Sequence, residues 1–115
     1  MDAADVLLGA RDVIADGWCH GHRAEDAAGK YRDADGTYME GWDPRATSWC
    51  LMGAVEKILG HRVDSSLYSL IADGLQARGY DGYIAFNDAT GRTQNQVIGM
   101  LDDLARDAKD SHLSV

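Results

Sequence analysis

The stretch from Trp42 to Ala54 constrains the fold more than any other part of the chain. It holds two of the three tryptophans, the only proline and one of the two cysteines. Aspartate followed by proline is a typical helix start, because the carboxylate caps free N–H groups and the φ angle of proline is already helical. We therefore expect a central helix that begins at Asp43-Pro44, or one turn later behind Thr47 or Ser48.

We expect the central helix to end at Gly60, because glycine is the usual residue after a helix C-terminus. Gly53 and Ala54 remove bulk at the cost of helix propensity, so another element should cross closely there. The side chains expected on the buried face are Trp49, Cys50, Gly53, Ala54 or Val55, Ile58 and Leu59.

Apolar residues at three- and four-residue spacing predict three further helices. The first spans residues 3–16 and is capped by Asp2, another spans residues 65–78, and the last follows a Thr93–Gln96 capping box. We expect residues 27–31 and 33–38 to be short strands joined by Asp/Gly turns. Residues 80–86 are expected to be a loop with a short extended run, and the tail from Asp110 to be frayed.

These elements predict an α+β, mainly α fold. About four helices pack around a central helix, and a small antiparallel β-ribbon lies between helices 1 and 2. A chain of 115 residues has room for one core, so residues 1–115 are expected to form a single domain.

The charge of the chain is strongly acidic, with 16 Asp and 3 Glu against 8 Arg and 3 Lys, a net charge of −8. An acidic surface disfavours direct binding to nucleic-acid phosphates. The same surface could instead mimic nucleic acid and occupy a basic partner. No basic leader precedes an apolar run, and no apolar run approaches the roughly 18 residues of a membrane span. We therefore expect a cytoplasmic protein without membrane contact, in which Cys19 and Cys50 are free thiols.

Three signatures stand in a fixed order along the chain. They are Gly-Trp-Cys-His-Gly at 17–21, Asp-Pro-Arg-Ala-Thr-Ser-Trp-Cys-Leu-Met-Gly-Ala at 43–54, and Phe-Asn-Asp-Ala-Thr-Gly-Arg-Thr at 86–93. Together they resemble a family of small proteins of unknown function from actinobacteria and their bacteriophages. That family usually has Trp where Phe86 stands. The resemblance covers nearly the whole chain and implies an actinobacterial or phage origin, in the host cytoplasm if phage-encoded, but no activity.

Cys50 is the candidate nucleophile, because a helix start lowers the pKa of a thiol. A cysteine enzyme also needs a base and a group that orients it. His20 or His22 could be the base, with Asn87 or Asp88 as the orienting group. His61 lies too far along the helix, roughly 16 Å at 1.5 Å per residue. The alternative is a buried Cys50 packed beside Trp49.

Metal binding is a second hypothesis, because Cys19, His20, His22 and Cys50 offer nitrogen and sulfur ligands of the kind that zinc prefers. The spacing Cys-His-x-His fits no standard zinc finger. The prediction is therefore no metal and no cofactor, with Cys19, His22 and Cys50 as the weak candidates.

A polar pocket is a third hypothesis. Asn87, Asp88 and Arg92 could fix a small ligand, with tryptophans as the apolar wall, namely Trp18, Trp42 and Trp49. In the alternative interpretation Asn87 and Asp88 form a turn, Thr93 caps the last helix, Arg92 pairs with an aspartate, and the tryptophans anchor the core.

The function predicted is that of a non-catalytic binding or accessory protein in the cytoplasm, with a protein as its partner. The alternatives are a cysteine-dependent hydrolase or transferase that uses Cys50, and a structural component of a virion. The sequence leaves the oligomeric state open. Any site requires residues 18–19 and 86–88 to pack against the first two turns of the central helix.

Overall fold

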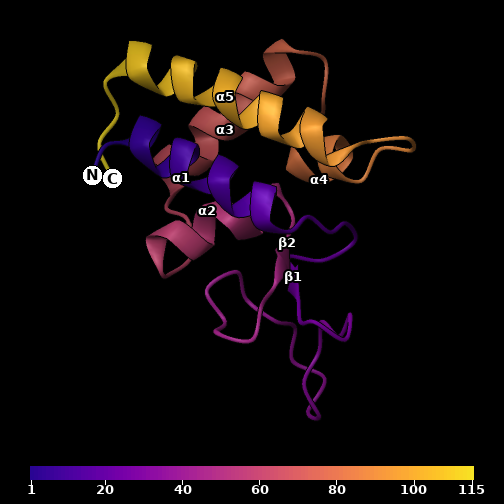
Figure 1. Ribbon diagram of the computed structural model, residues 1–115. Coiled ribbons are helices and arrows are strands. Elements are labelled where there is room, and N and C mark those ends of the chain that lie inside the picture. The colour runs from indigo at the N-terminus through magenta and orange to yellow at the C-terminus, as the bar shows by residue number, and fades with distance from the viewer.

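Two amphipathic helices from the two ends of the chain lie antiparallel and side by side in the computed structural model, which describes residues 1–115 (Figure 1). They are α1 (Ala3–Asp16) and α5 (Gln94–Ser111). Asp2 Oδ1 accepts a hydrogen bond from Asp5 N at 2.8 Å, and Thr93 and Gln96 form the capping box. Both predicted helix starts are therefore confirmed.

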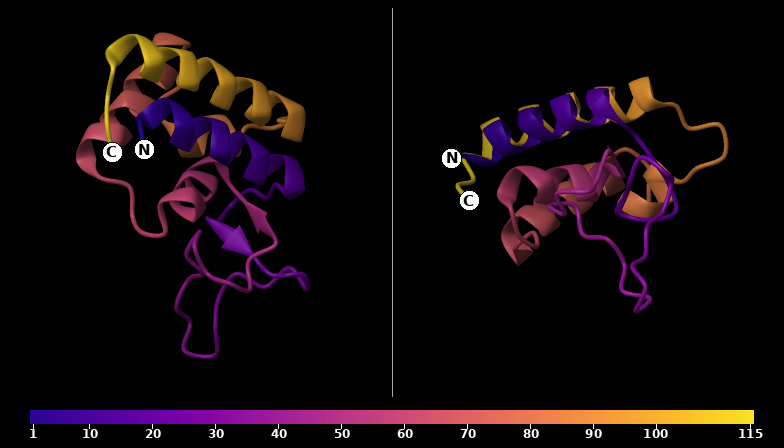
Figure 2. Two further views of the ribbon diagram at one scale, coloured as in Figure 1. Left: turned by 60° about the vertical axis from the view of Figure 1, so that its left-hand side comes forward. Right: turned by 60° about the horizontal axis from the view of Figure 1, so that its bottom comes forward.

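Three shorter helices and one sheet complete the fold, whose elements are β1 (Ala24–Glu25), β2 (Ser48–Trp49), α2 (Leu51–Leu59), α3 (Ser65–Ala77) and α4 (Tyr83–Asn87). The helices surround one cluster of 23 buried apolar residues, and residues of the segment between β1 and β2 extend away from them (Figures 1 and 2). The architecture is α+β and mainly α, with a two-stranded antiparallel sheet between α1 and α2, as predicted.

The C-terminal tail is paired with the N-terminus, so the prediction that it frays from Asp110 is wrong. Helix α5 continues to Ser111, and Ala3 N donates a hydrogen bond to Leu113 O at 2.9 Å. Asp2 and Ser114 form an isolated antiparallel bridge. Pairing between chain ends is a tertiary contact, which helix propensity alone does not report.

The central helix starts later than predicted. Helix α2 begins after Cys50, whose Sγ accepts a hydrogen bond from Gly53 N at 3.3 Å. The helix therefore does not begin at Asp43-Pro44, and it is capped by neither of the alternative residues, Thr47 and Ser48. The expected end at Gly60 is confirmed, since Gly60 has a left-handed φ of 77°.

Backbone pairing explains the late start of α2. Asp43 Oδ1 accepts a hydrogen bond from Arg45 N at 2.8 Å, which closes a turn of the chain there. Trp49 N then donates to Gly17 O at 3.1 Å, and Thr47 N donates to Glu25 O at 2.8 Å. These partners come from other segments and hold residues 47–49 extended, which overrides the local helix signal.

The strands of the ribbon are not the predicted ones. The antiparallel pair places Ala24 opposite Trp49, whereas residues 27–31 and 33–38 form no strand beyond an isolated bridge between Arg32 and Tyr38. The Asp/Gly turns are confirmed: Asp26 and Asp33 accept backbone N–H groups two and four residues on. With so few buried side chains, this segment is shaped by its turns rather than by a sheet.

Residues 83–87 form a helix, not the predicted extended run. Phe86 is buried, with its ring edge-on to Tyr80 at 4.9 Å between centroids. Burial of this aromatic ring against the body of the protein stabilises a helix too short to form alone. The predicted α3 is confirmed, with Asp64 as N-cap and Leu67, Ile71 and Leu75 buried.

None of the five helices combines the length and the apolar character that a bilayer span requires.

Gly53 marks the close crossing that the sequence predicted. A Cβ atom at Gly53 would lie 2.0 Å from Arg23 O, and one at Gly41 would lie 2.1 Å from Gly53 O. Glycine is also required at position 17 because a Cβ atom there would lie 2.1 Å from Thr47 O. The φ angle of Gly17 is −178°, an extended value that any residue can adopt, so the close contact alone excludes a side chain. Three backbone segments therefore approach each other at glycines around the start of α2.

Replacing Gly53 by alanine should destabilise the protein by about 3 kcal/mol, because the new methyl group meets backbone atoms that cannot rotate away. Gly99→Ala is the matched control: Gly99 also lies in a helix, but its Cβ would meet nothing within 4 Å. That variant should gain up to about 1 kcal/mol from helix propensity. Urea unfolding measures the unfolding free energy of both variants. Equal changes in the two variants would contradict the close crossing at Gly53.

Candidate functional site

The side-chain amide of Asn87, at the end of α4, joins three segments of the chain and is 1% exposed. Its Oδ1 accepts hydrogen bonds from Trp18 Nε1 and from Leu51 N, both at 3.0 Å. Its Nδ2 donates to Cys19 O at 3.1 Å and to Asp88 Oδ1 at 2.9 Å. The amide thus uses both of its donors and both acceptor positions within the protein.

The Asn87 contacts bring together the segments that the sequence analysis required for a site. Leu51 is the first residue of α2, so Asn87 satisfies one of the free N–H groups of that helix. Asp88 Oδ1 also accepts a hydrogen bond from Gly21 N at 3.0 Å, and Cys19 N donates to Trp49 O at 3.0 Å. Residues 18–21 and 86–88 therefore pack against the start of α2.

A cavity of about 100 Å³ lies where these segments meet. Its wall is made by three segments, which are the loop after α1, the cap of α2, and α4 with the residue that follows it. The lining residues are Gly21, His22, Arg23, Cys50, Tyr83, Ile84, Asn87 and Asp88. A water molecule occupies about 30 Å³ in the liquid, so the cavity holds about three waters or the end of one side chain.

An ion pair between Arg23 and Glu56 lies beside the cavity. Glu56 in α2 is fully buried, and its Oε1 is 2.6 Å from Arg23 Nη1. Arg23 Nη2 also donates to the hydroxyl of Tyr83 at 3.3 Å. Burial raises the pKa of Tyr83, so its hydroxyl stays protonated at neutral pH. The guanidinium in the cavity wall is thus neutralised by a carboxylate from the core.

Cys50 lies in the cavity wall as a capping thiol. Burial raises its pKa to about 11, although the amides of Gly53 and Met52 and the charge of Arg23 act in the opposite direction. No hydrogen bond joins Cys50 to a histidine. At neutral pH its reactive thiolate is therefore a minor species.

Cys19 is the second buried thiol, and both cysteines are free, as predicted. Burial raises its pKa well above the ordinary value, with the negative charge of Glu25 acting in the same direction. The structure brings Cys19 and His22 together with Glu25, whereas Cys50 does not belong to this group.

Besides Trp18 and Cys19, four of the candidate residues lie outside the cavity wall. His20 is exposed, and Trp42 is partly buried away from this wall. Trp49 is buried and donates from Nε1 to Gly41 O at 2.9 Å. Arg92 donates from Nε to Phe86 O at 2.7 Å and covers the Phe86 ring, so it stabilises the end of α4.

Sequence reasoning missed Arg23, Glu56, Tyr83 and Ile84. Only Glu56 carried a signal, because it lies four residues after Met52 and three before Leu59, on the apolar face of the helix, where burial requires a partner. Arg23, Tyr83 and Ile84 reach the cavity through loop and helix packing that no local pattern reports.

Asn87→Ala should destabilise the protein by about 3 kcal/mol or more, because it leaves Leu51 N and Cys19 O buried without partners. Asn95→Ala, at an exposed position on α5, should change the stability by less than about 0.5 kcal/mol. Urea unfolding of the two variants tests this, and similar losses at both sites would contradict the role of Asn87.

Stability should fall at alkaline pH through Cys50. Its pKa is raised on folding from 9.0 to about 11, so its contribution is complete below pH 9 and is lost as the pH rises to about 11. Cys50 contributes at most about 1.4 kcal/mol per pH unit to the slope, and Cys19, whose pKa is also raised by burial, adds to the slope in the same direction. Cys50→Ser keeps a capping group but does not titrate in this range, so its unfolding free energy should depend less on pH. Denaturant titrations at several pH values measure this dependence. If the unfolding free energies of the wild type and of Cys50→Ser fell equally with pH, Cys50 would not be the group responsible.

Comparison with known proteins gives a family and no activity. The model described as a family of unknown function, DUF6197, matches residues 1–107. No curated protein matches the chain, and neither does any solved structure. The expected membership in a family of unknown function is confirmed, while the actinobacterial and phage origin stays a prediction. The chain belongs to the DUF6197 family.

Proposed function

We propose that this protein is a non-catalytic binding protein, acting in the cytoplasm, that receives a basic side chain of a partner protein in the cavity beside Asn87. The observation that carries the proposal is the cavity itself: it is formed by three separate segments and is open beside exposed apolar residues.

The size of the cavity favours a side chain over a free ligand. Sites for small molecules and cofactors measure about 300–1,000 Å³. A cavity of about 100 Å³ takes only the end of one side chain. The remaining contact area of a specific complex would then come from the surface around it.

The surface beside the cavity supplies an apolar rim. Ile84 is 60% exposed, and Tyr68 on α3 is 44% exposed, with its ring edge-on to Tyr83 at 6.3 Å between centroids. A shallow depression next to the cavity is lined by Tyr68, Tyr83, Ile84 and Ala85 together with Asp81 and Gly82. Aromatic residues on a concave surface are typical of protein interfaces.

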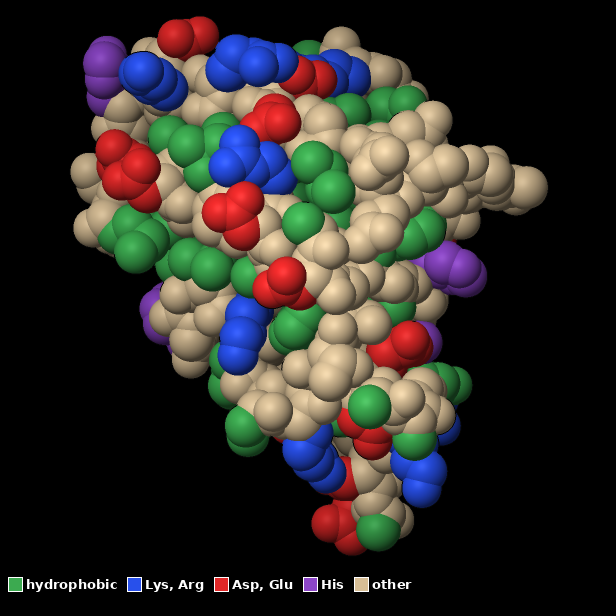
Figure 3. All heavy atoms as spheres, viewed as in Figure 1, with side chains coloured by type: hydrophobic (Ala, Val, Ile, Leu, Met, Phe, Trp, Pro, Cys, Tyr) green, Lys and Arg blue, Asp and Glu red, His purple; other side chains and the backbone are tan.

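The charges at this surface favour a cationic group. Asp81 and Asp88 form no ion pair, and Asp88 Oδ2 makes no hydrogen bond, whereas Arg23 is paired with Glu56. On the face seen in Figure 3, acidic and basic side chains are interspersed. The local aspartates would select a lysine or arginine of the partner. The net charge of −8 would accelerate its approach.

The properties of Cys50 support binding over cysteine catalysis. Its sulfur accepts the hydrogen bond of Gly53 N, and its raised pKa keeps it a thiol at neutral pH. Two free buried thiols also suit a reducing compartment such as the cytoplasm.

Affinity capture from an actinobacterial lysate, followed by mass spectrometry, tests the proposal. The wild-type protein should recover a basic polypeptide that Ile84→Arg does not recover, because the arginine covers the rim and repels a cation. Val115→Arg is the matched control, because Val115 is also exposed and lies at the chain end, outside this surface.

The recovered partner is then purified and its affinity measured by titration. Asp88→Asn keeps the Oδ1 acceptor of Gly21 N but removes the charge, so it should weaken binding about tenfold or more, or about 1.4 kcal/mol. Equal capture by Ile84→Arg, or no specific protein from the wild type, would overturn the proposal.

A further inference from the structure

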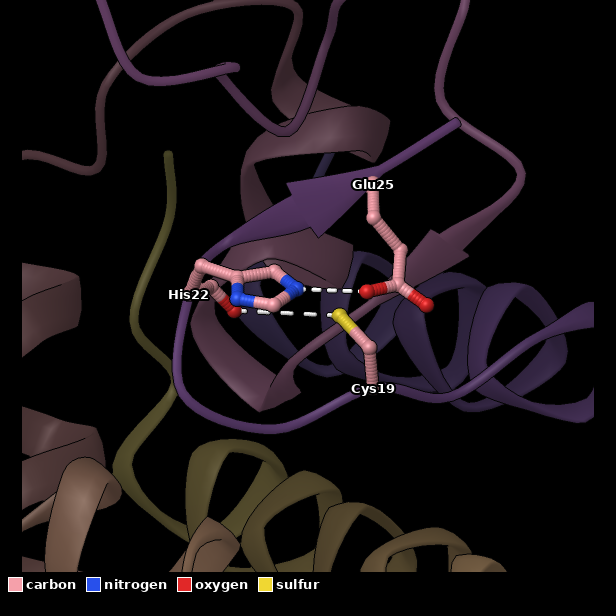
Figure 4. Close-up of side chains that lie close together, drawn as sticks. All are labelled: Cys19, His22 and Glu25. Atoms are coloured by element: carbon pink, nitrogen blue, oxygen red, sulfur yellow. Dashed lines mark hydrogen bonds and ion pairs between the residues drawn. The ribbon is translucent and has the colours of Figure 1, made fainter. Parts of the chain in front are cut away.

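Three side chains in the loop after α1 and in β1 offer ligand atoms to a common point. They are Cys19, His22 and Glu25, and their sulfur, nitrogen and carboxylate atoms all lie within 4.8 Å of one another. Figure 4 shows the thiol of Cys19 and the imidazole of His22 facing the carboxylate of Glu25. His22 Nε2 is 2.6 Å from Glu25 Oε2.

The backbone around these residues is held by pairing with β2, and Cys19 Sγ adds a hydrogen bond to His22 O at 3.8 Å. Cys19 N donates a hydrogen bond to Trp49 O, and Glu25 is paired with Ser48 in the sheet. The imidazole of His22 stacks on the ring of Tyr31, with 4.1 Å between centroids and an interplanar angle of 6°. The two ends of the loop are thus fixed, and the imidazole is held in one plane.

We propose that Cys19, His22 and Glu25 bind one zinc ion, with water in the fourth position. This proposal does not depend on the proposed binding function. Thiolate and imidazole ligands favour zinc over magnesium and calcium, which require oxygen ligands. Three protein ligands and one open position are a common arrangement for tetrahedral zinc.

Charge balance in a largely buried site supports the assignment. The side chains of His22 and Glu25 are 14% and 26% exposed, and Cys19 is 5% exposed as a residue. A thiolate and a carboxylate carry two negative charges, which a divalent cation cancels while neutral His22 adds none. Binding releases the thiol proton of Cys19 to solvent.

The rearrangement that binding requires is small. Tetrahedral zinc with bonds of about 2.0–2.3 Å places its ligand atoms about 3.4–3.6 Å apart. Glu25 Oε2 would move away from His22 Nε2, now at 2.6 Å, and the other ligand atoms, which lie within 4.8 Å of one another, would move closer by up to about 1.3 Å. Side-chain rotations provide such shifts while the paired backbone stays in place.

Metal titration of the chelator-treated full-length chain tests the site. Zinc competition against a chromophoric chelator should give one ion per chain. Cobalt should give the thiolate-to-metal charge-transfer band and the intense visible bands of a tetrahedral site with one cysteine. Glu25→Gln keeps the shape of the side chain and should weaken zinc binding about tenfold or more. Cys19→Ser should also abolish the charge-transfer band.

Cys50→Ser and His20→Ala are the matched controls, because they remove the other cysteine and the neighbouring histidine without touching the cluster. Both should bind zinc as the wild type does, and zinc should raise the Tm of both. Circular dichroism establishes that each variant is folded. Loss of binding in either control, equal binding in Glu25→Gln, or cobalt spectra without the charge-transfer band would overturn the proposal.

Discussion

The Asn87 side chain is the interaction on which this region of the protein depends. It hydrogen-bonds the loop after α1 and the first N–H of α2 from the end of α4. Leu51 is fully buried, so water cannot satisfy that N–H group in its place. A hydrophobic side chain of the same size at position 87 would leave the N–H group of Leu51, at the start of the central helix, without a hydrogen-bond partner. Asn87 therefore joins the start of α2 to α4 and to the loop after α1, the segments that form the cavity wall.

The segment at residues 19–25, which comprises the loop after α1 and strand β1, belongs to both proposed sites. Its residues Gly21, His22 and Arg23 lie in the cavity wall, while His22 also lies between Cys19 and Glu25. A zinc ion held by His22 would fix the orientation of an imidazole that also lines the cavity. The two sites would then be coupled through one histidine, with neither proposal requiring the other.

Much of the fold was predictable from local signals. Asp2, the Thr93–Gln96 pair and the apolar spacing of α1, α3 and α5 act within a few residues, and each predicted the correct element. Asp43-Pro44 is an equally good local signal, yet it closes a turn, because residues 47–49 find backbone partners in other segments. The site was predictable in part: residues 18–19 and 87–88 do meet at α2, but Arg23 and Tyr83 showed no pattern.

The sequence by itself determined where most helices lie, that the two thiols are free, and that Gly53 admits a close neighbour. These properties depend on residue type and short-range spacing, which any stretch of chain carries with it. Only the tertiary structure decided that Cys50 begins the central helix, that Arg23 meets Glu56, and that Glu25 joins Cys19 and His22. Such contacts arise when distant segments pack, because burial of a polar or charged group is less costly where another segment supplies a partner.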